Sequence, residues 1–310
     1  MKINSNKLKS IFLLSLVGSN LAKEESSKNQ SELTLNSLPQ IGANFTKREN
    51  ETDPTLIFGG YPIAFENQKN CFASFALIEA KYNDDCEWGR GNVFLTSSRC
   101  CTTERFCDRF TVFSAGNSSK RVGQISDLAL TFGRGVFLID FAVVIPDNGL
   151  KLIPYVMGPE DLYPITSLAT AAIESQVCAY GPLRGYLCGS VVEMNTGVEY
   201  VDPSGETLTF TDVNKVDLGT NGFTIEELGS PVYTKNNIGE RTTAQALGYI
   251  TDIDNSDPNH NFFYYTPIDK VLEKMINRFD YCYYTLLTYN ETNAQEYDQL
   301  IAQVEIPAKK

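Results

Sequence analysis

Few side chains of this chain have the types and the spacing that catalysis requires. A serine hydrolase needs a nucleophile, a base within hydrogen-bond reach of it, and a third group that orients the base. Ser97, Ser98 and Ser230 could supply a hydroxyl, but no base stands beside any of them in the sequence. The only histidine, His260, lies in the polar loop 257–261, where we expect it to be exposed. The residues by themselves therefore predict structural hydroxyls and no assembled catalytic group.

Metal and cofactor chemistry also lacks the residues that it needs. Asp252, Asp254 and Asp257 lie close together, but their loop has neither the glycine nor the twelfth-position glutamate of an EF-hand. No Cys-X-X-Cys pair occurs, and one histidine is too few for an ordinary zinc site. We expect neither a metal nor a cofactor.

The compartment follows from the N-terminus and from the cysteines. Residues 1–22 contain three lysines, then the apolar run 11–18 and then small residues, which is the layout of a secretory signal. The run is too short to span a bilayer. Eight cysteines in an exported chain indicate disulfides. We therefore expect a secreted protein without a membrane anchor, glycosylated at the five Asn-X-Ser/Thr sequons, Asn29, Asn44, Asn50, Asn117 and Asn290.

Composition and charge limit the classes of partner. With 42% hydrophobic residues among 310, the chain can bury one large core or two medium ones. Its 26 basic and 38 acidic residues give a formal net charge of −12. Such a chain repels nucleic acid and anionic lipid, so we expect no nucleic-acid partner and no membrane partner. The charge is typical of a soluble secreted protein and also suits cationic partners.

Most of the chain has the pattern of short β-strands. Residues 23–56 are polar and indicate a flexible leader or propeptide. From Ile57 onward, short runs rich in β-branched and aromatic residues alternate with Gly, Asn, Asp and Pro, which predicts an all-β sandwich or a pair of barrels. Apolar residues spaced by three and one across Ile268–Phe279 predict an amphipathic helix. We expect residues 280–310 to be a tail.

Four segments, in the same order, carry a family resemblance. They are Ile-Phe-Gly-Gly at 57–60, the strand 71–75 followed by Phe-Leu-Thr-Ser-Ser-Arg-Cys at 94–100, the Val-Cys…Gly-Tyr-Leu-Cys-Gly hairpin at 177–189, and Glu-Glu-Leu-Gly-Ser-Pro-Val at 226–232 with the runs 246–248 and 263–268. Together they make residues 57–279 resemble the chymotrypsin-type serine proteases, most of all the bacterial streptogrisin and α-lytic protease branch. The hairpin with its two cysteines is the most specific part of the match.

The resemblance implies a fold and two disulfides. The implied fold is all-β, with two six-stranded antiparallel barrels at about 57–165 and 166–279 and a C-terminal helix. The implied disulfides are Cys71–Cys100 and Cys178–Cys188. The resemblance leaves open the oligomeric state. It also leaves open the pairing of the other four cysteines, Cys86, Cys101, Cys107 and Cys282.

The resemblance also assigns the three positions of a catalytic triad, and two of them hold residues that cannot perform the chemistry. Asp140 stands at the position of the aspartate that orients the base. Arg99 stands at the position of the histidine, and a guanidinium stays protonated and offers no lone pair. Leu228 stands at the position of the nucleophilic serine. Glu226 replaces a glycine whose amide helps to bind the oxyanion in the family.

These substitutions predict a secreted serine protease homologue that is not itself a protease. We expect it to act by binding, as a decoy or a regulator, with protease inhibitors, active proteases or host and surface proteins as partners. The alternative is a serine endopeptidase with a non-standard or relocated catalytic group. We expect the guanidinium of Arg99 to lie near Asp140, because a buried carboxylate without a partner is costly. We also expect the bulk of residues 251–253 and of Leu228 to leave a shallow, apolar specificity pocket.

Overall fold

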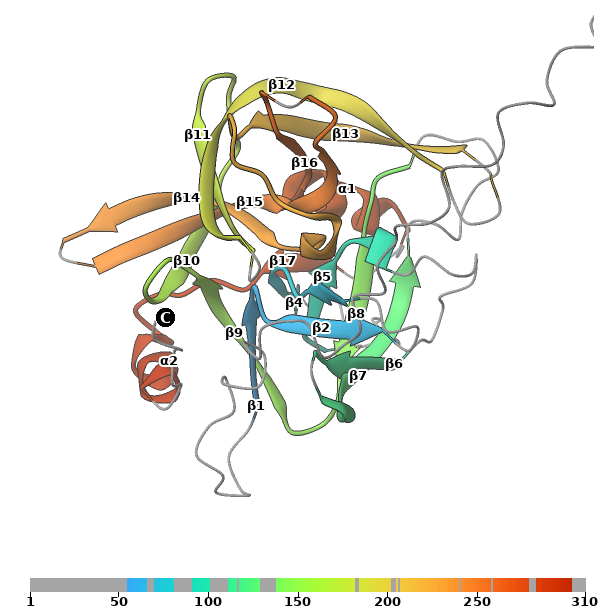
Figure 1. The fold of residues 1–310 in the computed structure, drawn as a ribbon. Coiled ribbons are helices and arrows are strands. Elements are labelled where there is room, and N and C mark those ends of the chain that lie inside the picture. Colours follow the sequence, from blue (N-terminus) through green and yellow to red (C-terminus); the bar gives the residue numbers. More distant parts are fainter. Residues whose placement is uncertain are drawn as a thin grey trace, which may run out of the picture. The chain divides into compact units, whose positions relative to one another are not determined.

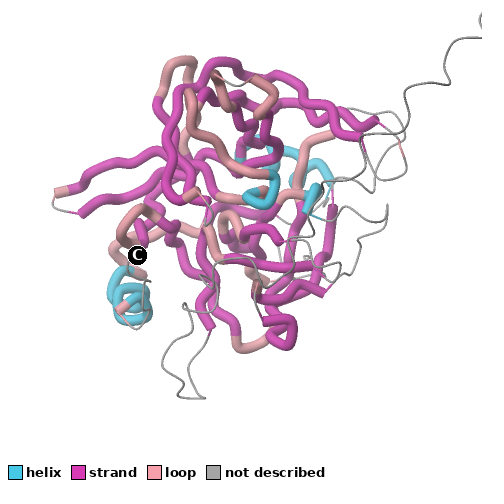
Figure 2. Tube along the Cα trace, viewed as in Figure 1, coloured by secondary structure: helices cyan, strands magenta, loops and turns pink. Residues whose placement is uncertain are grey.

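The structure is a computed structural model, and it describes residues 55–65, 70–80, 91–100, 111–115, 117–128, 138–181, 184–201, 205, 207–239, 241–257, 259–278 and 283–302. Strands make up most of them (Figure 2). The expected signal peptide and all but the last two residues of the expected leader lie outside these ranges. The same is true of Cys86, Cys101, Cys107 and Cys282, and of the sequons at Asn29, Asn44 and Asn50.

The first barrel is a ring of six positions formed by seven strands, because two of the strands together occupy one position. The strands are β2 (Pro62–Phe65), β3 (Asn70–Phe72), β4 (Ala76–Ala80), β5 (Val93–Thr96), β6 (Thr111–Ser114), β7 (Asn117–Leu128) and β8 (Ala142–Pro146). β3 and β4 are two halves of one bent segment, since β3 pairs with β2, β4 pairs with β5, and at the bend Ser74 N donates to Leu95 O over 2.7 Å. From β5 the ring continues through β8, β7 and β6 back to β2, with antiparallel pairing throughout.

Six further strands close the second barrel. They are β11 (Gln176–Gly181), β12 (Gly185–Val201), β13 (Thr207–Asp217), β14 (Pro231–Ile238), β15 (Arg241–Asp254) and β16 (Phe262–Pro267). The ring closes because β15 pairs antiparallel with β14 on one side and with β16 on the other. β14 and β15 form a long hairpin (Figure 1), whose turn holds Gly239 at φ 62°, a conformation that glycine adopts without strain. The predicted fold class is thereby confirmed.

Three strands outside the rings extend the second sheet. β1 (Thr55–Gly59) runs parallel to β9 (Leu150–Met157), β9 forms a hairpin with β10 (Leu162–Leu168), and β10 runs parallel to β15. The expected pattern was antiparallel throughout, and the two parallel pairings depart from it. The pairing of β10 with β15 arises because β10 continues across the expected boundary at residues 165 and 166 and joins a strand of the second barrel. β1 also begins at Thr55, within the expected leader.

Helix α1 (Ile268–Arg278) occurs where the apolar spacing predicted it. It begins directly after Pro267, which is compatible with a helix start because the missing amide hydrogen has no partner to lose there. Ile268, Val271 and Met275 recur at helical spacing, are fully buried, and share a core cluster with Phe75 of the first barrel. The helix therefore covers apolar surface of the barrels with one face.

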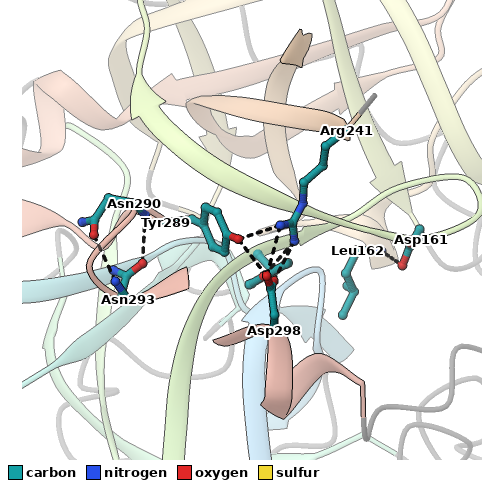
Figure 3. Close-up of polar contacts among 8 residues, drawn as sticks. Asp161, Leu162, Arg241, Tyr289, Asn290, Asn293 and Asp298 are labelled. Atoms are coloured by element: carbon teal, nitrogen blue, oxygen red, sulfur yellow. Dashed lines mark hydrogen bonds and ion pairs between the residues drawn. The ribbon is translucent and has the colours of Figure 1, made fainter. Parts of the chain in front are cut away.

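The segment after α1 is folded and is not the expected tail. β17 (Tyr283–Leu286) pairs with β4, and Tyr289 N donates to Ile165 O over 2.7 Å. Helix α2 (Ala294–Ile301) then brings Asp298 to Arg241 of β15. Figure 3 shows the side chains of Arg241 and Tyr289 pointing toward Asp298. The segment thus contacts both barrels, because β4 belongs to the first and β15 to the second.

The two disulfides implied by the family resemblance are present. Cys71 is bonded to Cys100, and Cys178 is bonded to Cys188. The second pair lies directly opposite in the ladder of β11 and β12, so the bond closes a hairpin that the backbone has already formed. In the part of the chain that the structure describes, no helix has the length and the apolar character needed to cross a membrane.

Candidate functional site

The turn after β5 places Arg99 at the contact between the two barrels. Ser98–Cys100 form a short 3₁₀ helix, and the disulfide from Cys100 to Cys71 holds this helix against β3. Thr96 Oγ1 adds a bond of 2.8 Å to Phe72 O. Arg99 is only 7% exposed, so its charge needs a partner inside the protein.

Asp140 is fully buried and is bound by the two serines that precede Arg99. Ser97 Oγ donates to one carboxylate oxygen over 2.8 Å, while Ser98 donates to the other through its amide over 2.7 Å and through its hydroxyl. Burial raises the pKa of Asp140, and the bonds from Ser98 and Ser97 oppose that rise. The hydroxyl of Tyr249 donates to the Asp140 carbonyl over 2.5 Å. The carboxyl group is therefore fixed on several sides.

Arg99 does not pair with Asp140, contrary to our expectation. Its guanidinium donates to Thr251 O over 3.1 Å, forms an ion pair with Asp252, and lies over the ring of Tyr200 at 4.4 Å. The expectation failed because it left out the serines: their hydroxyls already occupy the carboxylate of Asp140. Arg99 instead reaches from the first barrel to β12 and β15 of the second.

Leu228 lies in a turn that is clamped onto the first barrel. It follows the 3₁₀ helix Ile225–Glu227, is fully buried, and accepts a bond of 3.1 Å from Phe72 N at its carbonyl. Gly229 has a φ of 83°, and a Cβ there would come within 2.5 Å of Phe72 O. The Cys100 sulfur is 4.0 Å from Leu228 O. The structure thus gathers Asp140, Arg99 and Leu228 around the turn at residues 97–100, although Arg99 pairs with Asp252 and not with Asp140.

Glu227, next to Leu228, is a fully buried carboxylate that orders the same turn. It accepts the amides of Thr224 over 2.6 Å and of Arg184 over 2.9 Å. The missing side chain of Gly181 makes room, since a Cβ there would lie 2.2 Å from Glu227 Oε1. In the family an aspartate at this position receives a new N-terminal ammonium in many relatives. Here Ile57 is a buried residue inside β1, paired with Leu152.

The other residues singled out from the sequence lie apart from this turn. His260 is exposed, as expected, and contacts Asp217 at 3.0 Å. Asp254 accepts the amide of Ser256 and Asp257 that of Asn259, so these carboxylates serve local turns. The two sequons that the structure describes start at Asn117, the first residue of β7, and at the exposed Asn290.

Sequence reasoning missed the partners of Arg99. The sequence suggested Asp252 as one of three acidic residues without an EF-hand pattern and as bulk in a specificity pocket, and it gave no signal for Tyr200. The contacts join residues about 100 to 150 positions apart, and no local spacing reports such a distance. The one available signal was charge: a buried arginine needs a carboxylate, and Asp252 is an acidic residue among residues 251–253, which we expected at the specificity pocket.

Known structures share this architecture. The fold matches protease A of Thermobifida fusca (TM-score 0.53, 21% identity), a Nocardiopsis protease, NAPase (0.52, 21%), and a chymotrypsin of Cellulomonas bogoriensis (0.51, 18%). Each comparison covers 76% of this chain and all of the other chain. No protein-family model matches the sequence, and no curated protein does. The chain therefore has the chymotrypsin-type fold that these three proteases share. At these identities the likeness concerns the fold alone.

Proposed function

We propose that this chain is a secreted serine protease homologue that does not hydrolyse peptides and acts by binding other proteins. The observation that carries the proposal is the state of Arg99. A guanidinium that is charged, buried and paired with Asp252 cannot accept a proton from a nucleophile. Leu228 has no nucleophilic atom. Loss of the base or the nucleophile alone lowers the turnover of a serine protease by on the order of 10⁶.

A relocated nucleophile is the competing explanation, and the burial of the nearby hydroxyls argues against it. Ser97 and Ser98 are fully buried and donate to Asp140, so neither faces a substrate. Ser230 is also fully buried, and among the described residues its hydroxyl has no hydrogen-bond partner and hence no base. A nucleophile must both reach the scissile carbonyl and contact a base.

Binding is the role that this scaffold supports. Each barrel has one internal disulfide, Cys71–Cys100 in the first and Cys178–Cys188 in the second, and such a bond contributes about 2–4 kcal/mol in proteins generally. Protease inhibitors, active proteases and host or surface proteins are the partner classes that suit an exported homologue of this fold. As a decoy it would engage inhibitors, and as a regulator it would engage active relatives.

Two measurements test the proposal. The natural protein and an Arg99→His plus Leu228→Ser variant are incubated with a fluorophosphonate probe and with casein, beside an active chymotrypsin-type protease as control. We expect neither labelling nor turnover by the natural protein, and either result would overturn the loss of catalysis. The folded protein is then immobilised and exposed to panels of protein inhibitors and of active proteases, with a reduced, unfolded sample as control. A third panel holds host and surface proteins, and absence of saturable binding to every member of the three panels would overturn the binding role.

A further inference from the structure

The outer half of the β12–β13 hairpin crosses from the second barrel to the first. We call this part, residues 196–201 with 207–211, the strap. It lies alongside Leu138, two residues before Asp140: Leu138 N donates to Thr209 O over 2.9 Å, and Thr211 N donates to Leu138 O over 2.8 Å. A hairpin of one barrel is thus extended by a piece of backbone from the other.

One face of the strap is packed inward. Phe210 is fully buried and clusters with Leu138, while Val198 and Leu208 lie partly buried against it. Tyr200, on the same face, places its ring over the guanidinium of Arg99 at 4.4 Å. The alternate positions on β12 face solvent, and Val201 is 61% exposed. The strap therefore covers Arg99 with one side and is hydrated on the other.

The strap begins at a double irregularity in the hairpin. Asn195 on β12 and Asp212 on β13 both have left-handed backbone angles, φ 52° and φ 58°, and the strand register shifts on each side of Thr196. Such bulges bend and twist a hairpin locally. Below the bend, Asn214 accepts the amide of Asn195 over 3.1 Å and donates to the hydroxyl of Tyr265 over 2.9 Å. The inner half is therefore fixed to the barrel, and the bend separates it from the strap.

We propose that the strap is an autoinhibitory cover over the triad positions, which opens by bending at Asn195 and Asp212. When closed, it shields Arg99 and, through it, the stretch of β15 that Arg99 contacts, so a protein partner reaches that strand only after the strap has moved. Among the described residues its attachments include two backbone hydrogen bonds, one cation–aromatic contact and a small apolar cluster. Opening at such a place costs less than unfolding the barrel. The proposal concerns access to the site and holds whether or not the site has lost catalysis.

Chemical modification of Arg99 tests the cover. Phenylglyoxal reacts with accessible guanidinium groups, and peptide mapping gives the rate at each arginine. In the natural protein we expect Arg99 to react at least about ten times more slowly than Arg121, whose side chain is 47% exposed. Removing the ring by Tyr200→Ala should speed the reaction of Arg99 about ten-fold, the equivalent of a cation–aromatic contact of ~1.4 kcal/mol. Val201→Ala, the neighbour on the exposed face, is the matched control and should change nothing.

The idea fails if Arg99 reacts as fast as Arg121 in the natural protein, or if Tyr200→Ala behaves like Val201→Ala. Hydrogen exchange of the backbone amides in the natural protein tests the opening of the strap independently, even if the Tyr200 variant does not fold. The amides of Leu138 and Thr211 should exchange at least about ten times faster than that of Ile250, which bonds Ser230 O inside the barrel, and far more slowly than a free peptide. Equal protection of all three amides would mean that the strap is part of the rigid barrel. No protection at Leu138 and Thr211 would mean that it is not closed.

Discussion

The C-terminal segment is held to the second barrel by the carboxylate of Asp298. Removing this carboxylate by mutation tests the attachment. Asp298 accepts hydrogen bonds from Tyr155 and Tyr289, both at 2.9 Å, and two from the guanidinium of Arg241, at 2.9 and 3.4 Å (Figure 3). Arg241 also lies over the ring of Tyr289 at 4.6 Å. The perturbation is Asp298→Ala, which deletes all four bonds at once.

The expected loss of stability follows from the exposure of these groups. The side chains of Arg241 and Asp298 are 42% and 46% exposed, so solvent screens the ion pair to below about 1 kcal/mol. The bonds from the two tyrosines each add about 0.5–1.5 kcal/mol. We therefore expect Asp298→Ala to lower the free energy of unfolding by about 2 kcal/mol. For a domain of this size the midpoint of thermal unfolding should fall by about 4 °C.

Urea unfolding at neutral pH measures the effect, with Glu296→Ala as the matched control in the same helix. Glu296 makes one ion pair, with Lys151, and its side chain is 61% exposed, so this variant should lose less than about 0.5 kcal/mol. A double-mutant cycle of Asp298→Ala with Arg241→Ala should give a coupling of about 1 kcal/mol. The bond from Arg241 lowers the pKa of Asp298. The stabilisation should therefore be present above the unfolded carboxyl pKa and vanish as the pH falls through the folded one.

Two outcomes would refute this reasoning. The first is an Asp298→Ala protein as stable as the natural one, since the four bonds would then contribute nothing. The second is strict additivity of the Asp298 and Arg241 variants, since the two groups would then not interact. Either result would mean that the Asp298 contacts do not hold residues 283–302 in place.

Three further predictions concern the site. Arg99→Met should cost about 3 kcal/mol in urea unfolding because it leaves Asp252 poorly hydrated without its cation, and adding Asp252→Asn should recover part of the loss. Gly229→Ala should cost about 2 kcal/mol or more by the same measurement, because its φ is positive and a Cβ would collide with Phe72 O. Burial raises the pKa of Asp140, so the folded state holds that proton more tightly; stability should be greatest below the unfolded carboxyl pKa and decline as the pH rises through the folded one, and Asp140→Asn should lack this decline.

The barrels could be predicted from the sequence because their signals are local. Short runs rich in β-branched and aromatic residues predict strands, and the family resemblance of residues 177–189 implied the hairpin and the disulfide of Cys178 and Cys188. The helix at Ile268–Arg278 follows from apolar periodicity. The parallel pairing of β10 with β15 and the docking of β17 on β4 depend on partners far away in the chain. No local pattern carries that information.

At the site, the sequence specified which residues would meet and failed on how they would pair. The resemblance brought Arg99, Asp140 and Leu228 to one turn, as the structure does. The partner of the Arg99 side chain could not be predicted, because it depends on which donors bind the carboxylate of Asp140. The hydroxyls of the two serines that precede Arg99 donate hydrogen bonds to the carboxylate of Asp140. The longer arginine side chain reaches a more distant carboxylate. The prediction paired Arg99 with Asp140 by charge alone and failed because it left out the serine donors.

The substitutions at Arg99 and at Asp252 explain one another. Their side chains are 9% and 14% exposed, and either charge alone would be desolvated without compensation, which is costly in proteins. By the resemblance, Arg99 stands at the position of the base and Asp252 lies among residues 251–253, which we expected at the specificity pocket, so we infer that one ion pair joins these two positions. A histidine at residue 99 would then leave Asp252 without its cation. We therefore expect that a return to a protease-like site would need a change at 252 as well as histidine at 99 and serine at 228, and, on our proposal, the opening of the strap.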